Sequence, residues 1–159
     1  MTHKAIYIEL THLMSVFKAL LKDVYSIHSV VKLEDHSVGT AQPAFNQCLD
    51  DVSIVYQFQM GKSRGFILFS DDLGQWLLSQ LLGVYLPNQA SMLESFSYQL
   101  FIDDGFNSSD LFHDFQLIDK KSIWIHPEFD QFYPMSFSIF KSPNDAIKNW
   151  IFIPKELDK

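Results

Sequence analysis

The chain has 159 residues, which is the size of a single domain, and its 47% hydrophobic content suits a packed core rather than a disordered segment. A net charge of -7, with no basic run longer than Lys120–Lys121, argues against nucleic acid as a partner. No apolar run approaches the ~18 residues of a membrane span, so no membrane insertion is expected. The single cysteine, Cys48, excludes an intrachain disulfide framework, and we expect a cytoplasmic protein.

The first third of the chain predicts one long helix and one strand. Apolar residues recur at intervals of three and four from His3 to Val24, which is typical of an amphipathic helix. Residues Ile27–Glu34 read as a strand, and Gly39 and Pro43 then mark a loop.

A hairpin and a helix are predicted in the middle of the chain. Ser70 or Asp71 can cap this helix, which should stop at Gly83. The hairpin before it begins with a strand over residues 51–60, in which apolar residues alternate from Val52 to Phe58. A turn at Gly61–Gly65 and a returning strand at Phe66–Phe69 follow.

The remaining part of the chain predicts a second long helix and then mostly strands. The helix should run from Gln89 to about Asp103, with Gly105 as its stop. Pro143, Asn144 and Asp145 make a turn between the last two strands. The four strand candidates are residues 112–119, 122–128, 132–141 and 148–155. The sequence contains no linker, so we expect one α+β domain over residues 1–159, with a mainly antiparallel sheet packed against long helices.

A weak internal similarity links the two hairpins. The segment "ILFSDDL" (Ile67–Leu73) closes the first hairpin, and "IFIPKEL" (Ile151–Leu157) closes the last. Each passes from an apolar strand through Ser or Pro to charged residues and then Leu. This pattern indicates either a duplicated strand–hairpin–helix unit or chance similarity.

Common catalytic and metal-binding motifs are missing from the sequence. No pair among the six histidines has the HExxH spacing, and there is no CxxC, so we predict no metal site and no cofactor. Cys48 lies beside acids in "NQCLDD", which would raise the pKa of its thiol rather than activate it. "MGKSRG" lacks the spacing of a phosphate-binding loop.

The predicted helix that begins at Gln89 carries one carboxylate, Glu94, among serines and aromatic residues. At 100° per residue, Leu93, Phe96 and Leu100 form one stripe that we expect to face the core. A different side of the helix gathers a carboxylate with small and aromatic residues, which suggests a recognition surface. The alternative is that the two aromatic residues pack under a neighbouring strand and the carboxylate is solvated. The residues of this side are Ala90, Glu94, Ser97, Tyr98 and Phe101.

The order of the predicted elements resembles the CheC/CheX chemotaxis phosphatase family, to which the middle domain of the flagellar switch protein FliM is related. The segments that carry the resemblance are "RGFILFSDDLGQWLLSQLLG" and "FYPMSFSIFKSPNDAIKNWIFIP", and the likeness covers about Leu10 to Pro154. The resemblance implies a CheY-like receiver domain as partner and a homodimer. It also implies that any enzymatic activity would be hydrolysis of a receiver phospho-aspartate.

The motif of that family has Asp or Ser, three residues, Glu, two residues, Asn. Laid over this sequence, the Glu falls on Glu94, the first position on Ala90, and the water-orienting Asn on Ser97. A serine lacks the amide that orients the attacking water, and Gln99 points more than about 100° away from Glu94 on a helix. We therefore expect a receiver-binding domain with weak or no phosphatase activity. The alternatives are an active phosphatase using Glu94 and Ser97, and a FliM-like structural switch component.

Overall fold

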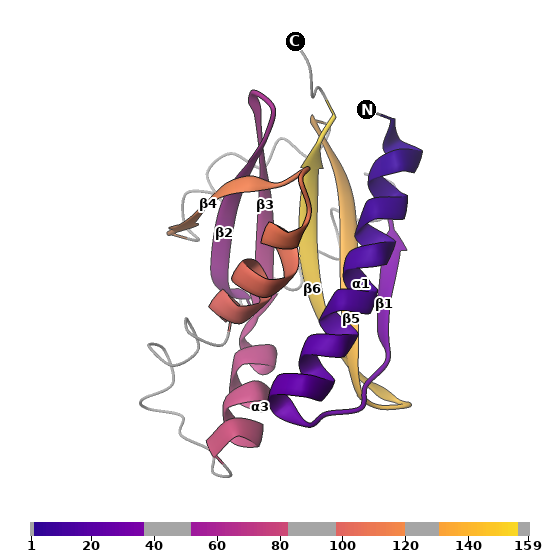
Figure 1. Ribbon diagram of the computed structural model, residues 1–159, viewed down its shortest axis with the longest axis vertical. Coiled ribbons are helices and arrows are strands. Elements are labelled where there is room, and N and C mark those ends of the chain that lie inside the picture. The colour runs from indigo at the N-terminus through magenta and orange to yellow at the C-terminus, as the bar shows by residue number, and fades with distance from the viewer. Residues whose placement is uncertain (1, 37–51, 83–97, 120–130, 156–159) are drawn as a thin grey trace.

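The computed structural model describes residues 2–36, 52–82, 98–119 and 131–155 (Figure 1). The described residues form one six-stranded sheet in the order β1-β5-β6-β3-β2-β4, and every neighbouring pair is antiparallel. The expected α+β architecture with an antiparallel sheet is therefore confirmed. The strands are β1 (Val31–Asp35), β2 (Val52–Met60), β3 (Ser63–Ser70), β4 (His113–Ile118), β5 (Phe132–Ser142) and β6 (Asp145–Pro154).

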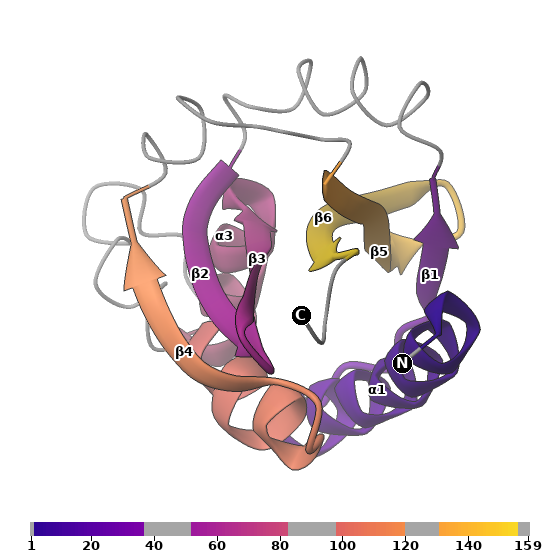
Figure 2. The ribbon, with the colours of Figure 1, turned by 90° about the horizontal axis from the view of Figure 1, so that it is seen from above.

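The helices gather on one side of the sheet (Figure 2). Helix α1 (His3–Tyr25) begins at Thr2, whose side chain accepts a hydrogen bond from the Ala5 amide, and it buries the apolar stripe predicted from the sequence. Helix α3 (Asp71–Leu82) follows β3 directly. A helical segment from Tyr98 to Ser108, which contains the π turn η2 (Phe101–Gly105) and the 3-10 turn η3 (Phe106–Ser108), leads towards β4.

Two predicted strand starts were wrong, each for a local reason. Strand β1 begins at Val31 rather than Ile27, because Ser26 adopts a left-handed conformation and the Ile27 amide bonds back to the Leu21 carbonyl. Strand β3 begins at Ser63 rather than Phe66, because the hairpin turn contains only Gly61 and Lys62.

Gly65 was interpreted as part of that turn, but it lies within β3 and pairs with Phe58. A Cβ atom at Gly65 would collide with the Phe58 ring and would lie 2.6 Å from the Phe152 carbonyl oxygen. The glycine is therefore required by close packing and not by turn conformation.

Two further predictions concern the remaining segments. The helical structure passes Gly105 and ends at Ser108, so Gly105 is not the stop. A Cβ atom at Gly105 would meet the ring of Phe17, which explains a glycine at this contact between helices. The strand predicted at residues 122–128 lies outside the described residues.

The sheet has the arrangement expected of a duplicated unit. If β1 is exchanged with β4, β5 with β2 and β6 with β3, the result is the same strand order read from the other edge of the sheet. At its centre, Ile67 of β3 pairs with Ile151 of β6, and these are the residues that head the two similar segments of the sequence. The interpretation of the similarity as a repeat is therefore supported by the topology. We call β1–β3 with α1 the first half, and β4–β6 with residues 98–108 the second half.

The sheet buries apolar side chains on both faces. The larger cluster lies between the sheet and the helices and includes Phe17 of α1, Phe69 of β3 and Phe137 of β5. The smaller cluster, on the other face, consists of Val52, Val55, Leu68, Trp150 and Phe152. No phenylalanine in the described parts of the chain is exposed, so the heavy aromatic content serves the core.

Candidate functional site

The predicted recognition surface divides between described and undescribed residues. Ala90, Glu94 and Ser97 lie outside the described residues, as do Leu93 and Phe96 of the expected core stripe. Tyr98 and Phe101 are described, and their exposed fractions are 0% and 1%. The alternative, that these two aromatic residues pack beneath neighbouring elements, is therefore confirmed, and their expected place on an exposed surface was wrong. The reason is that this segment packs against both α1 and β3, so that more than one of its sides is buried.

The Tyr98 hydroxyl group connects this helical segment to the start of α3. It donates a hydrogen bond to the Ser70 carbonyl oxygen and accepts one from the Gly74 amide at 2.8 Å. Ser70 and Gly74 are four residues apart, so they are the partners that would form the first hydrogen bond of the helix. The tyrosine hydroxyl thus stands between the two groups and satisfies both inside the core.

Ser70 is the meeting point of this buried network. Its side chain accepts from the Asp72 amide at 3.2 Å, which confirms Ser70 as the helix cap. Its own amide donates to the Asn149 side-chain oxygen at 2.9 Å, and the Asn149 amide group reaches the Phe137 carbonyl oxygen at 3.5 Å. Asn149 has an exposed fraction of 0%. The junction of β3 and α3 is therefore held from two sides, by Tyr98 and by Asn149.

Sequence reasoning missed this network, although one signal was present. Asn149 occupies an inward-facing position of β6, between Ile147 and Ile151, where alternation calls for an apolar side chain. A polar residue at such a position indicates a buried hydrogen bond.

Aromatic packing fixes the same helical segment from a second direction. The Tyr98 ring is stacked on Phe69, with centroids 4.6 Å apart and an interplanar angle of 9°. The Phe101 ring meets Phe17 of α1 edge-on at 5.1 Å. Such pairs add to the burial of apolar surface. The start of the described helical segment is therefore packed against both α1 and β3.

Gln99 forms a polar contact at the rim of this segment. Its side-chain amide donates to Asp103 at 2.8 Å, and its oxygen faces the Tyr56 hydroxyl at 3.3 Å. Burial, and secondarily the negative charge of Asp103, raises the pKa of Tyr56 above its ordinary value. Both ends of the Gln99 amide are occupied, which agrees with the expectation that it does not replace the missing asparagine.

Metal or nucleophile chemistry gains no support from the described parts of the chain. Within them, no cluster of His, Cys, Asp and Glu could hold a metal ion. Cys48 and His126 lie outside the described residues.

A hollow of about 270 Å³ lies beside the start of α3, lined by Asp71, Asp72, Trp76 and Lys141 among others. The two aspartates belong to the positive end of the helix, where they stabilise α3. This accounts for them without a ligand.

Comparison with known proteins gives a result at the level of structure. No family model and no curated protein matches the sequence. Among solved structures, FliY from Thermotoga maritima matches with a TM-score of 0.58 and 8% identity, over 91% of this chain and 85% of that one. The FliM middle domain from Vibrio alginolyticus matches with a TM-score of 0.57 and 12% identity, over 96% of this chain and 94% of that one. FliM in a complex with SpeE from H. pylori matches with a TM-score of 0.58 and 8% identity, over 95% of this chain and 86% of that one.

Sequence identities this low show the fold and not the function.

In the described part of the chain, no helix combines the length and the apolar character needed to cross a bilayer. The TM-scores and the coverage of both chains show that this chain has the fold of FliY and of the FliM middle domain.

Proposed function

We propose that the chain is a binding module for the phosphorylated receiver domain of a CheY-like protein in chemotaxis or two-component signalling, with weak or no phosphatase activity. The observation that carries this proposal is the likeness to FliY and FliM structures over 91–96% of the chain. One of those structures is a complex of FliM with SpeE, so the fold is found with a second protein bound. Its cellular location in this proposal is the cytoplasm.

Glu94 is the residue that would contact the receiver. In the related phosphatases, the resemblance implies, this acid pairs with a lysine of the receiver. On the helix predicted from the sequence, Ala90 would lie one turn before Glu94, and its small side chain would leave room for close approach. Tyr98 and Phe101 are buried, so in this proposal they do not contact the receiver but anchor their helical segment against the core.

Ser97 sets the expected level of activity. Hydrolysis of an acyl phosphate needs a group that fixes a water molecule in line with phosphorus. The serine hydroxyl is close to the backbone and offers no amide, so we expect binding without efficient hydrolysis. Ser97→Asn should increase the rate of receiver dephosphorylation, provided that the surface still docks the receiver.

The test measures binding and hydrolysis separately. Receiver domains of the host are titrated by calorimetry with and without beryllofluoride, which mimics the phosphoryl group. We expect binding that depends on the mimic, a loss of about tenfold in affinity for Glu94→Ala, and almost no change for Asp110→Ala, which removes an exposed carboxylate from a turn. Receiver dephosphorylation is followed in parallel for the wild type and Ser97→Asn. Strong wild-type phosphatase activity that survives Glu94→Ala would place the chemistry elsewhere.

A FliM-like structural component of a flagellar or secretion switch is the second candidate. It is favoured by the same structures, because two of the three are FliM. Neighbouring genes separate the two candidates, since a receiver or kinase gene supports the signalling module and motor genes support the structural component. Absence of binding to every host receiver would favour the second candidate.

A homodimer is part of the proposal. Among the described strands, β1 and β4 each pair on one side only and form the edges of the sheet. Unpaired edges can associate with another copy of the chain. Light scattering at tens of micromolar, roughly the range of weak dimers, should show a dimer, and a strict monomer would contradict this.

A further inference from the structure

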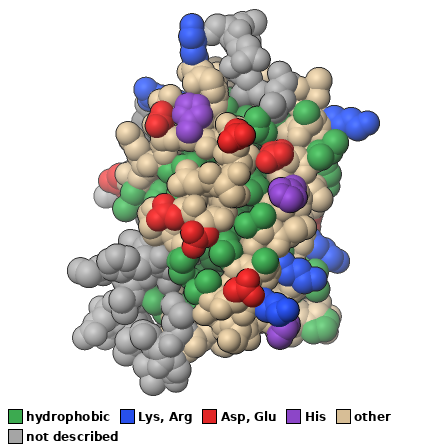
Figure 3. Space-filling view, in the orientation of Figure 1, with side chains coloured by type: hydrophobic (Ala, Val, Ile, Leu, Met, Phe, Trp, Pro, Cys, Tyr) green, Lys and Arg blue, Asp and Glu red, His purple; other side chains and the backbone are tan. Residues whose placement is uncertain are grey.

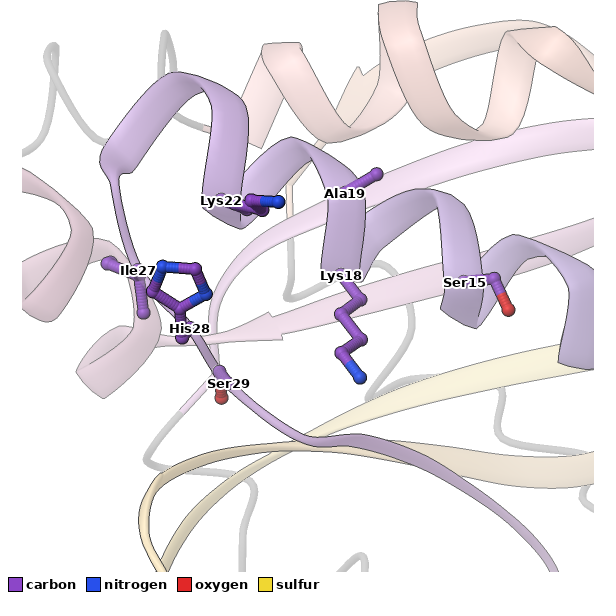
Figure 4. Close-up of a pocket in the computed structure, with 7 residues that line it drawn as sticks. All are labelled: Ser15, Lys18, Ala19, Lys22, Ile27, His28 and Ser29. Atoms are coloured by element: carbon purple, nitrogen blue, oxygen red, sulfur yellow. The ribbon is translucent and has the colours of Figure 1, made fainter.

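A groove lies at the C-terminal end of α1, far along the chain from the Gln89 helix (Figure 4). Its volume is about 240 Å³. One wall is the last two turns of α1, and the other is the segment that leads into β1. The lining residues used below are Lys18, Ala19, Lys22, Ile27, His28 and Ser29.

The backbone builds this groove as a rigid feature. The left-handed Ser26 ends α1, and the amides of Ser26 and Ile27 bond back to the carbonyl groups of Lys22 and Leu21. The chain therefore turns sharply and passes beside the last turns of the helix. The Ser29 hydroxyl donates to the Phe140 carbonyl oxygen, which fixes the second wall to β5.

The charges at the groove are unbalanced. Lys18 and Lys22 are one turn apart on α1 and exposed, and within the described residues neither forms an ion pair. His28, also exposed, adds a third basic side chain. Lys22 lies in the last turn of α1, where a cation stabilises the helix. Lys18 lies one turn earlier, so its charge does not contribute to the helix in this way.

Lys18 and Lys22 lie together on a chain that is acidic as a whole. The whole chain carries a net charge of -7. On the face shown in the space-filling view, Lys and Arg side chains gather at the lower right with an acidic side chain beside them, and the other acidic side chains are spread over the centre and the left (Figure 3). Between the two lysines, Ala19 contributes a small apolar surface, and Ile27 is partly buried on the opposite wall.

We propose that this groove docks an acidic segment of a partner protein. Carboxylates of the segment pair with Lys18 and Lys22, and one apolar side chain lies against Ala19 and Ile27. The proposal is independent of the proposed function, because none of these residues belongs to the Gln89 helix.

Other anionic partners fit the groove less well. A membrane surface is attracted by clusters of about 4–8 basic residues, and here there are two lysines and one histidine. Phosphate sites use backbone amides at a helix N-terminus, whereas this is the C-terminal end of α1. The Ser29 hydroxyl already bonds within the protein. The apolar walls favour a peptide, which can supply both a carboxylate and an apolar side chain.

The experiment uses the full chain and a fluorescein-labelled 12-residue peptide of Leu, Asp and Glu. Its amide counterpart, with Asn and Gln in place of the acids, is the matched probe, and phosphatidylserine vesicles are the rival surface. Lys18→Gln/Lys22→Gln is compared with Lys4→Gln/Lys62→Gln, which has the same net charge but alters two exposed lysines elsewhere. A third variant, Ala19→Phe, fills the groove without changing charge. Circular dichroism verifies that each variant is folded.

We expect the wild type to bind the acidic peptide, with about tenfold loss of affinity in the groove double variant and about twofold in the control. Ala19→Phe should weaken binding by about fivefold, and salt should weaken the wild type more than the groove variant. Backbone amide shifts in nuclear magnetic resonance should concentrate at residues 15–29. Equal binding of the amide peptide, equal loss in the two double variants, or preferential binding to the vesicles would each overturn the proposal.

Discussion

In the first hairpin of the sheet, Phe58 of β2 faces Gly65 of β3, whereas in the last hairpin Phe137 of β5 faces Asn149 of β6. These positions correspond, because Gly65 and Asn149 each lie two residues before the paired isoleucines at the centre of the sheet. In the first half, Gly65 has no side chain and so leaves space for the ring of Phe58. In the second half, the polar side chain of Asn149 forms a hydrogen bond with Ser70 of the first half.

A second pair of positions shows the same asymmetry. Ser70 lies three residues after Ile67, and Pro154 lies three residues after Ile151. Ser70 is hydrogen-bonded to two residues of the second half: its carbonyl oxygen accepts from the Tyr98 hydroxyl, and its amide donates to the Asn149 side-chain oxygen. Proline has no amide hydrogen, so Pro154 cannot make the bond that the Ser70 amide makes. The two halves therefore share a topology, but hydrogen bonds from the second half hold the start of α3, the helix that follows the first half.

The largest effect on this comparison is expected from Gly65→Ala. The new Cβ atom would meet the Phe58 ring and the Phe152 carbonyl oxygen at 2.6 Å, and a backbone oxygen within the sheet cannot move aside. We expect the free energy of unfolding to fall by about 3 kcal/mol or more. Urea denaturation measures it.

Gly105→Ala is the matched variant, because there the Cβ atom would meet only the side chain of Phe17. A ring can shift, so the loss should be smaller. Equal losses in the two variants would show that the backbone contact at Gly65 is not decisive.

Asn149→Ala should have the next largest effect. It leaves the buried Ser70 amide without its acceptor and removes volume from the core, which together should cost about 2–3 kcal/mol. Ser138→Ala, which alters a buried serine on the neighbouring strand β5, is the control and should cost less than about 1 kcal/mol. Hydrogen exchange of the Ser70 amide should accelerate only in the first variant. If it does not, Asn149 is not the group that holds the junction.

Tyr98→Phe should cost about 1–2 kcal/mol, because the Ser70 carbonyl and the Gly74 amide lose their shared partner and can re-pair only in part. Tyr56→Phe is the matched control, since the Tyr56 hydroxyl makes one longer contact, 3.3 Å, to the exposed Gln99. The control should change stability by less than about 0.5 kcal/mol. Thermal and urea unfolding that rank the two variants in the reverse order would contradict the role given to Tyr98.

The smallest effect concerns pH and the other face of the sheet. Burial lowers the pKa of His36 below its ordinary value of 6.5, with a smaller opposing effect of Glu34. The folded protein therefore binds this proton less readily than the unfolded chain, and stability should fall as the pH drops below about 6.5. Because a single ionisable group is involved and Glu34 opposes the effect of burial, this should be the smallest of the changes in stability.

His36→Gln should flatten this dependence between pH 7 and 5.5. The His36 ring lies 5.1 Å from the Trp150 ring and bonds to the Ser136 hydroxyl at 2.8 Å, so tryptophan fluorescence during urea unfolding is a suitable measurement. An unchanged slope in the variant would assign the pH dependence to other groups.

Local pattern was sufficient to determine the elements of this protein. The period of the apolar residues determined α1, and the alternation at Val52–Phe58 determined β2. Ser70, which caps α3, was one of the two cap candidates. The similarity of "ILFSDDL" and "IFIPKEL" marked the two strands that meet at the centre of the sheet. These features follow from residues close together in the chain.

Only the tertiary structure decided which sides of the helical segment from Tyr98 to Ser108 are buried and why position 65 needs a glycine. Helical periodicity gives the angle between Tyr98 and Leu100 but not the number of neighbours around the helix, and here α1 and β3 cover more than one side. Gly65 is compatible with a turn when only its neighbours in the chain are considered. The obstacles that require it, the Phe58 ring and the Phe152 carbonyl oxygen, come from other strands, and a contact over 87 residues of chain has no local signal.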